Sequence, residues 1–190
     1  MTESLVPAVR TSCTAAEMYA ALRGASGLTR AQVLVLLAQS AFETGRWGSM
    51  WCWNFGNAKH VPGDGRDYYQ IRCNEIINGR EVWFEPPDPA TSFRAFPTID
   101  AGCADYLALL EHRFAAAWPA VLAGDPAAFS HELKLAHYYT ADEALYTRNL
   151  VSLYAEFDRT VPQDDPAPFV GALPVVDNGQ PTPSGDLPPA

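Results

Sequence analysis

Glu43 is the acidic residue whose sequence context best fits catalytic chemistry. It lies in AQSAFETGRWGSMWCWNFGNAKH, residues 38–60, where an apolar helical pattern gives way to a segment rich in tryptophan and asparagine. The last turn of a helix carries a partial negative charge that opposes an ionised carboxylate, and Trp47, Trp51 and Trp53 would exclude water from it. Both effects raise a carboxyl pKa. The sequence therefore predicts a general acid that keeps its proton near neutral pH, against the alternative of an exposed glutamate at a helix end.

Glycosidases are one class of enzyme that uses such a general acid. They usually need a second carboxylate on the other side of the glycosidic bond, either as a nucleophile or to activate water. The candidates between residues 57 and 96 are Asp64, Asp67, Glu75, Glu81 and Glu85. Glu75 lies three residues before Asn78-Gly79, and an Asn-Gly pair between β-favouring runs is a strong signal of a hairpin. We expect the hairpin tip to hold Glu75 over a groove. A solvated surface acid is the alternative.

Helices are predicted on both sides of this β-favouring segment. Two of them begin with the pattern of a capping box, Thr14-x-x-Glu17 and Thr140-x-x-Glu143, and Gly45 follows the apolar helix capped by Thr29. The predicted helical stretches start near residues 14, 29, 98, 118, 125 and 140, and the last one ends near Thr160. Between them, DYYQIR and EVWF flank the Asn78-Gly79 turn.

The order of helices, small β-lobe and helices predicts one mainly α folded domain over residues 1–161, with the β-lobe at about 57–96. At 190 residues and 48% hydrophobic content, the chain can bury one core. Residues 162–190 are rich in proline and contain no Lys, Arg or Glu, so we expect a disordered tail or linker there.

Composition argues against several partners and cofactors. Thirteen Lys and Arg against 22 Asp and Glu give a net charge of -9, so we expect no nucleic acid. The sequence contains no apolar run of about 18 residues and starts without the pattern of a signal peptide. His131 and His137 are six residues apart and cannot share one zinc ion on a helix, so we expect neither a metal nor a cofactor. The chain is expected to be a monomer.

Four cysteines, Cys13, Cys52, Cys73 and Cys103, lack any C-x-x-C spacing. They are compatible with buried free thiols or with two disulfides. If disulfides form, we expect Cys52 to pair with Cys73, because these two bracket the sheet-like part of the chain.

Three ordered segments resemble the bacterial glucosaminidases of glycoside hydrolase family 73, the flagellar-rod and autolysin kind. Residues 38–60 resemble the family signature AQ-A-x-E-(S/T)-G-x-W-G followed by N-x-F-G-x-K. SFRAFPTIDAGCADYLALLEH is similar to the next family segment, and YYTADEALYTRNLVSLY resembles the closing pattern Y-A-T-D-x-x-Y with its helix. Two departures are visible: the loop motif is shortened to NFG after MWCW, and YYTADEALY is one residue longer than the usual spacing.

The resemblance implies a lysozyme-like fold and a role for several residues. Glu43 matches the family's general acid, Glu75 the acid on the β-lobe, and Tyr146 the tyrosine that lines the site. Tyr139 matches an aromatic residue one element earlier, and Asn54 and Phe55 match the loop that forms the floor of the cleft. Aromatic rings can pack against the flat faces of sugars, so we expect Trp47, Trp51 and Trp53 in the walls of the groove, with core packing as the alternative for each.

The resulting prediction is a peptidoglycan hydrolase, an endo-β-N-acetylglucosaminidase that cuts the β-1,4 bond on the reducing side of N-acetylglucosamine. Glu75 would stabilise the oxocarbenium charge or orient water, although the N-acetyl group of the substrate could replace it as a nucleophile. The alternatives are a muramidase or lytic transglycosylase on the same fold, and a non-catalytic wall-binding module.

The predicted place of action is the bacterial cell wall, in the periplasm or outside the cell. Delivery would use a phage lysis system, a secretion machine or another export route. Because an acidic protein gains no attraction to an anionic wall, we expect the tail or a delivery partner to provide targeting.

Overall fold

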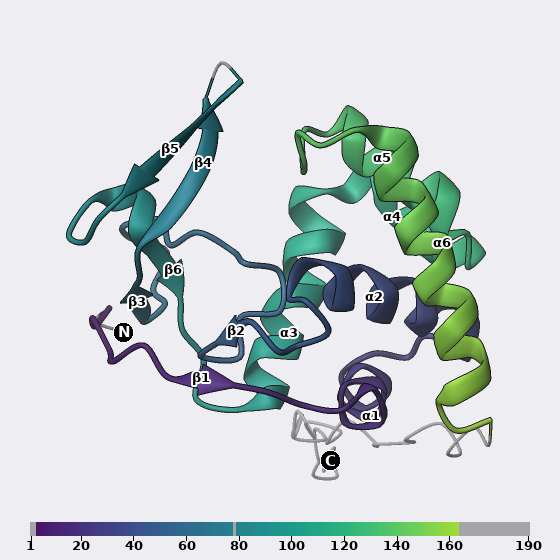
Figure 1. Cartoon of the computed structure of the whole chain (residues 1–190). Helices are drawn as coiled ribbons and strands as arrows, with labels where there is room; N and C mark the ends of the chain where they lie inside the picture. The colour runs from purple at the N-terminus through teal and green to yellow at the C-terminus, as the bar shows by residue number, and fades with distance from the viewer. Residues whose placement is uncertain (1–2, 78, 164–190) are drawn as a thin grey trace, which may run out of the picture.

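The computed structural model describes residues 3–77 and 79–163, and the side chains of Glu75 and Ile76 are outside that description. The tail predicted over residues 162–190 lies almost entirely outside the described residues. Figure 1 shows a helical part and a β-rich part that lie side by side, joined near α3 and β2. Among the described residues, no helix combines the length and the apolar character that crossing a bilayer requires.

Within residues 3–77 and 79–163, the helical part contains six α-helices, with a π-helical turn and one 3-10 turn between α3 and α4. The helices are α1 (Ala15–Ala25), α2 (Arg30–Glu43), α3 (Ile99–Ala108), α4 (Trp118–Ala123), α5 (Pro126–Leu135) and α6 (Glu143–Thr160). The π-helical turn η2 covers Leu109–Arg113, and the 3-10 turn η3 covers Ala115–Ala117. The predicted mainly α architecture with a small β-lobe is confirmed.

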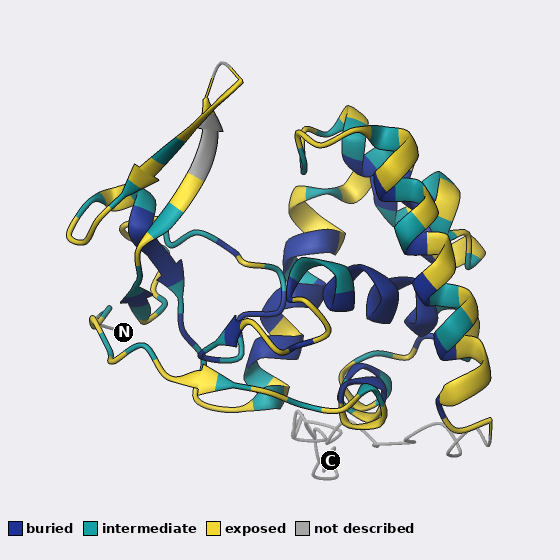
Figure 2. Cartoon of the chain, viewed as in Figure 1, coloured by how far each residue is buried: buried dark blue, intermediate teal, exposed yellow. Residues whose placement is uncertain are grey.

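Helix α2 lies at the centre of the core. Its residues from Val33 to Ala41 are all buried, including the polar Gln39 and Ser40, and Figure 2 shows this helix in dark blue surrounded by the others. An amphipathic helix buries one stripe, whereas a helix that is buried on every side must be covered by several neighbours. Helices α1, α4, α5 and α6 supply that cover. At the C-terminal end of α2 the last two residues, Phe42 and Glu43, are partly exposed, so this helix carries Glu43 from the core to its edge.

The helix caps agree with the sequence at one predicted capping box and differ at the other. Thr14 and Glu17 form the predicted capping box of α1. The box predicted at Thr140 is wrong, because Asp142 is the N-cap of α6 and accepts the Leu145 N–H at 2.8 Å. Aspartate is at least as good a cap as threonine, and here it begins the helix two residues later.

Three separate two-stranded antiparallel sheets make up the β structure. Strand β1 (Arg10–Thr11) pairs with β2 (Met50–Trp51), β3 (Tyr68–Gln70) pairs with β6 (Ser92–Arg94), and β4 (Cys73–Ile77) pairs with β5 (Arg80–Phe84). A 3-10 turn, η1 (Pro89–Thr91), precedes β6. Ile77 lies opposite Arg80, so the hairpin predicted at residues 78–79 is confirmed; Asn78 itself is outside the described residues.

The sequence did not predict the partner of the strand within DYYQIR. Strand β3 joins β6 rather than the hairpin, and Tyr69 stacks on Phe93 with ring centroids 5.7 Å apart. Together with Cys52 these rings form a second small core beneath the hairpin. Cys52 and Cys73 both border this core, but all four cysteines are free thiols, so the conditional pairing of Cys52 with Cys73 does not occur.

Gly102 lets α3 approach the segment that follows β2. A Cβ atom at this position would lie 2.1 Å from the Trp53 carbonyl oxygen and 3.1 Å from the Phe55 ring. The Trp53 carbonyl belongs to the backbone and cannot rotate away. Glycine at this position therefore brings the two parts of the chain together.

We predict opposite effects for the same substitution in two helices. Gly102→Ala should destabilise the fold by about 1–3 kcal/mol because the new methyl group must displace backbone. Gly24→Ala in α1 meets nothing within 4 Å and should stabilise by about 0.5–1 kcal/mol through lower chain entropy. Urea unfolding of both variants measures the difference. A neutral Gly102→Ala would contradict the close packing described here.

Candidate active site

Glu43 is the last residue of α2, and a sharp turn leads the chain away from it. Thr44 is the C-cap of the helix. Its hydroxyl donates to the Ser40 carbonyl at 2.7 Å and accepts the Trp47 N–H at 3.0 Å. Gly45, Arg46 and Trp47 all have positive φ values. This turn directs the residues after Glu43 away from the end of the helix, so the Glu43 side chain faces a cavity.

Two side chains donate to one oxygen of the Glu43 carboxyl, and a third orients one of these donors. Tyr146 from α6 donates to Oε1 at 2.8 Å, and Nε2 of Gln39 lies 3.3 Å from the same atom. The hydroxyl of Tyr106 donates to Oε1 of Gln39, which turns the Gln39 amide nitrogen toward Glu43. The carboxyl is therefore positioned by partners from α2, α3 and α6.

Aromatic packing fixes the ring of Tyr146. It stacks on Tyr139 with centroids 3.7 Å apart and an interplanar angle of 3°, and its other neighbour is the edge of Phe42 at 4.8 Å. Tyr138, next in the chain to Tyr139, accepts from Gln39 Nε2 at 2.9 Å. These contacts fix the orientation of the Tyr146 ring, and its hydroxyl faces Glu43.

Burial raises the pKa of Glu43 above its ordinary value, because the charged form loses its water. The hydrogen bonds from Tyr146 and Gln39 favour the charged form and oppose this shift, but burial is the larger effect. Burial also raises the pKa of Tyr138 and Tyr146 well above the usual tyrosine value, so both remain donors. Glu43 therefore holds a proton at a pH where an exposed glutamate has lost it, as a general acid requires.

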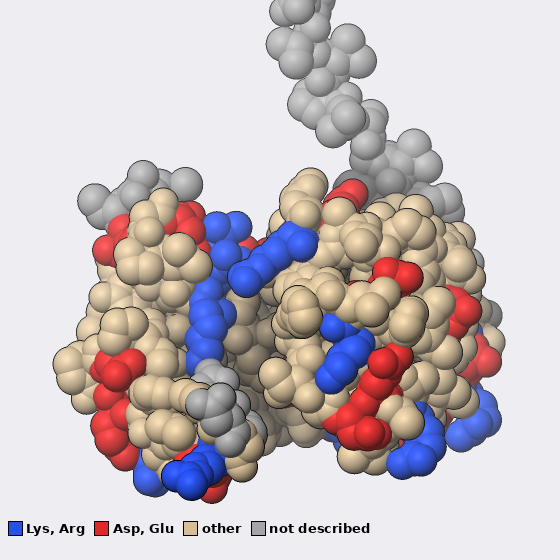
Figure 3. All heavy atoms as spheres, turned by 90° about the horizontal axis from the view of Figure 1, so that it is seen from above, with Lys and Arg blue, Asp and Glu red and all other residues tan. Residues whose placement is uncertain are grey.

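Glu43 lines two adjoining cavities. One, of about 270 Å³, also borders Gly56, Asn57, Lys59, Arg94, Arg113, Phe114, His137 and Tyr138. The other, of about 380 Å³, borders Phe42, Tyr138, Tyr139, Thr140, Ala141 and Tyr146. Figure 3 shows the hollow between the β-rich part and the helical part. Because Glu43 and Tyr138 belong to both cavities, the two form a groove that passes the carboxyl on either side.

Several predicted binding residues lie in the core instead of in this groove. Trp47 is 3% exposed, donates its Nε1 to Ser40 and packs against Phe157. Phe55 is 1% exposed and is part of the main core. We therefore assign Trp47 and Phe55 to packing, the alternative that the sequence left open for the tryptophans.

Asn54 is buried and acts on the loop that borders the groove. Its Nδ2 donates to the carbonyls of Ala58 and Arg94, both at 3.0 Å, and its Oδ1 accepts the Ala58 N–H at 2.8 Å. Next to it, Asn57 donates to the Glu43 carbonyl at 2.7 Å. Asn54 thus holds the floor of the cleft in place without facing a ligand.

The remaining two tryptophans lie away from Glu43. Trp51 stacks under the guanidinium of Arg10 at 4.9 Å, and Trp53 lines two other cavities, bordered by residues 6–21 and 95–100 among others. Glu75 lies on β4 opposite Val82, but its side chain is outside the described part of the structure. Of the predicted residues, the structure brings together Glu43, Tyr139 and Tyr146.

Gln39 and Tyr138 are site residues that the sequence analysis missed. Gln39 precedes Glu43 by four residues, so helical periodicity places them on the same face, and this signal was available. Tyr138 stands beside Tyr139 in the same YY pair, and nothing in the sequence indicates which of the two reaches Gln39.

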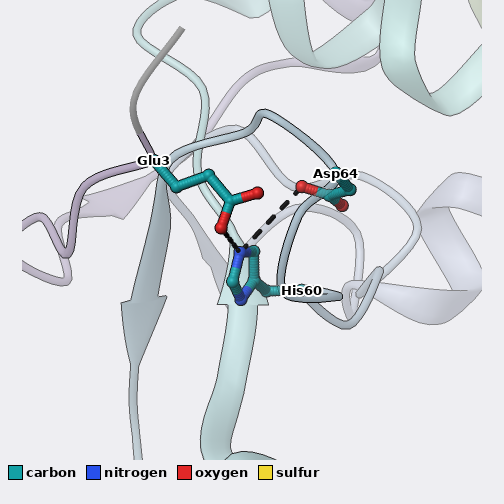
Figure 4. A group of neighbouring side chains, drawn as sticks. All are labelled: Glu3, His60 and Asp64. Atoms are coloured by element: carbon teal, nitrogen blue, oxygen red, sulfur yellow. Dashed lines mark hydrogen bonds and ion pairs between the residues drawn. The ribbon is translucent and has the colours of Figure 1, made fainter.

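Glu3, His60 and Asp64 form a separate group whose ligand-type atoms lie within 4.8 Å of one another (Figure 4). His60 Nε2 is 3.3 Å from Glu3, which also accepts the Gly65 N–H at 2.7 Å. Asp64 already accepts from the Arg94 guanidinium at 3.1 Å. We interpret the group as an ion-pair cluster that fastens the N-terminal segment to the loop after His60.

No family model matches the chain, and no curated protein matches it. Several solved structures are similar to the chain. A peptidoglycan hydrolase mutant from Sphingomonas sp. A1 aligns with a TM-score of 0.54 at 21% identity, over 74% of this chain and 88% of that one. The C-terminally truncated glycoside hydrolase domain of Salmonella typhimurium FlgJ aligns with a TM-score of 0.51 at 23% identity, over 76% of this chain and 97% of that domain. These alignments show the class of fold: the chain has a mainly α fold with a small β-lobe. In particular, it has the fold of these two hydrolase domains, and the resemblance seen in the sequence is confirmed at that level.

Removal of the Tyr146 hydroxyl should raise the pKa of Glu43 further. Tyr146→Phe keeps the ring stacked on Tyr139 but deletes a donor that favours the ionised carboxylate. A carbon-13 NMR titration of the Glu43 carboxyl measures the change, with Tyr154→Phe on the same helix as the control. An unchanged or lower pKa in Tyr146→Phe would show that the hydroxyl does not support the charged form.

Glu43 should make folding stability fall as the pH rises. Since its folded-state pKa is raised, the folded chain binds this proton more tightly than the unfolded chain, whose value is about 4.3. The stabilisation is complete below that value and is lost as the pH rises through the folded-state pKa. Glu43→Gln lacks this loss, so its stability relative to the wild type should increase between pH 4 and pH 8. Urea unfolding across that range tests this, and a constant difference would contradict it.

Proposed function

We propose that the chain is a peptidoglycan hydrolase, an endo-β-N-acetylglucosaminidase in which Glu43 is the general acid. The observation that carries the proposal is the position of the Glu43 carboxyl at the middle of a groove, where Tyr146 and Gln39 hold it and desolvation raises its pKa. The two hydrolase domains that share the fold, and the family resemblance of residues 38–60, support the choice of substrate.

In the proposed reaction, Glu43 gives its proton to the oxygen of the leaving sugar. The carboxylate that remains is stabilised by the hydrogen bonds from Tyr146 and Gln39, which strengthen as negative charge develops on Oε1. Before proton transfer the same two bonds lower the pKa of Glu43 less than desolvation raises it. The site therefore favours the protonated acid before transfer and supports the carboxylate after it.

A second group must meet the positive charge that develops on the sugar. We propose Glu75 on β4 for this role, or the N-acetyl group of the substrate acting in its place. The β4–β5 hairpin belongs to the β-rich part, across the hollow from the helices that hold Glu43 (Figures 1 and 3). Tyr138, Tyr139 and Tyr146 would supply the aromatic surface for sugar rings.

We further propose that residues 1–161 act as one catalytic domain and that the protein works as a monomer on the bacterial cell wall, in the periplasm or outside the cell. A phage lysis system or a secretion machine would deliver it. In this proposal, the proline-rich residues 162–190 serve as a tail or linker.

Hydrolysis of purified sacculi tests the proposal. Glu43→Gln should reduce the rate by about 10²–10⁴ while the unfolding curve remains cooperative, because only the proton donor is lost. Glu132→Gln on α5 makes the same chemical change away from the groove and should leave the rate unaltered. Full lytic activity in Glu43→Gln would end the assignment of the acid.

Mass spectrometry of borohydride-reduced fragments identifies the bond that is cut. Reduced N-acetylglucosamine ends support a glucosaminidase, whereas reduced muramic acid ends indicate a muramidase and anhydromuramic ends a lytic transglycosylase. Binding to sacculi without release of fragments would favour a non-catalytic wall-binding module.

A further inference from the structure

The cavity beside Glu43 is basic, although the chain as a whole carries a net charge of -9. Lys59, Arg94, Arg113 and His137 line it, and Glu43 is the one acidic residue among the described residues of its lining. Figure 3 shows Lys and Arg atoms along the hollow, while most of the visible Asp and Glu atoms lie on the outer surfaces. Clefts lined by one sign of charge concentrate ligands of the opposite sign.

Two of these cations already have structural partners. Arg94 is 12% exposed at its side chain and donates to Asp64 at 3.1 Å and to Asp105 at 2.9 Å. Lys59 donates to the Ala90 carbonyl at 2.6 Å and lies 4.1 Å from the centre of the Phe93 ring. These contacts hold both cations to the β-rich wall of the cavity.

Arg113 differs from both. It is the last residue of the π-helical turn η2, it is exposed, and it forms no ion pair with any residue that the structure describes. Its guanidinium lies 5.6 Å from the centre of the neighbouring Phe114 ring, which lines the same cavity. A guanidinium beside an aromatic ring keeps its hydrogen-bond donors available at its edge, where a planar carboxylate can bind two of them.

We propose that Arg113 binds a carboxylate of the glycan substrate in the cavity beside Glu43, and so favours wall glycan over neutral polymers of N-acetylglucosamine. The inference rests on the proposed function. A wall glycan strand offers this group from two sources: the lactyl ether of muramic acid, once the peptide is removed, and the stem peptide while it is attached. Both present the same chemistry to an arginine fork.

Strand binding tests the inference without depending on turnover. The full chain carrying Glu43→Gln is titrated by calorimetry with three soluble glycan strands: strands that retain stem peptides, strands trimmed by an amidase, and trimmed strands whose carboxyls are converted to methylamides. Addition of Arg113→Gln should weaken binding of a carboxylated strand about three- to tenfold, as expected for one partly exposed charge pair, and less at high salt. Binding of the methylamide strand should not change. The carboxylated strand that loses more affinity identifies the source of the carboxylate.

Matched variants separate this contact from general effects of charge. Arg159→Gln, at the far end of α6, changes the net charge equally and should leave all three affinities as they are. Arg113→Lys should keep part of the affinity, because it keeps the charge but loses the planar fork. Equal weakening of the carboxylated and methylamide strands by Arg113→Gln, or no weakening at all, overturns the inference.

The test also distinguishes this inference from the proposed function. A wild-type chain that binds carboxylated strands through Arg113 but releases no fragments overturns the glycosidase proposal and leaves the contact in place. Cleavage of glycan with no effect of Arg113→Gln on strand binding supports the glycosidase proposal and overturns the Arg113 contact. Failure of every strand to bind would overturn both.

Discussion

The buried carboxyl of Glu43 is the constraint on which the arrangement of the helical part depends. Removal from water raises the pKa of a carboxyl. The carboxyl also needs hydrogen-bond partners, because a buried polar group without them destabilises the fold. Gln39 on α2, itself held by Tyr106 from α3, is one of these partners, and Tyr146 is the other, from a helix about 100 residues further along the chain. The protonation state of one side chain therefore reports whether three helices are correctly packed.

Local signals in the sequence were sufficient to predict most of the helices and the hairpin. The helical stripe of α2, the capping box of α1 and the two-residue hairpin turn each depend on residues a few positions apart, and all three are present in the structure. The same reasoning failed at α6, where Thr140 and Asp142 are both good caps and only the packed helix decides between them. Strand β3 shows the same limit, because its partner β6 lies more than twenty residues away, beyond a hairpin that could have paired with it.

The aromatic residues show why the lining of the site could not be predicted to the same degree. Proximity in sequence indicated that Trp47, Trp51 and Trp53 would exclude water from Glu43. The rings that do so are tyrosines of the C-terminal half, whereas Trp47 turns into the core at a bend of positive φ residues. Any large ring can fill a core or line a groove, and the backbone path decides which. The family resemblance indicated Tyr139 and Tyr146, which line one cavity with Glu43 in the structure, because a family pattern reflects the backbone path and composition does not.

Net charge is a sum that contains no information about position. A total of -9 indicated that the protein would gain no attraction to an anionic wall. At physiological ionic strength, however, exposed charges are screened beyond about 8 Å, so a ligand inside the cleft responds mainly to the charges that line it. Those include Lys59, Arg94 and Arg113, next to the Glu43 carboxyl, whose pKa desolvation raises. Desolvation of Glu43 favours the neutral form of its carboxyl, so the proposed acid catalysis and the proposed attraction of an anionic strand depend on the same physical effect.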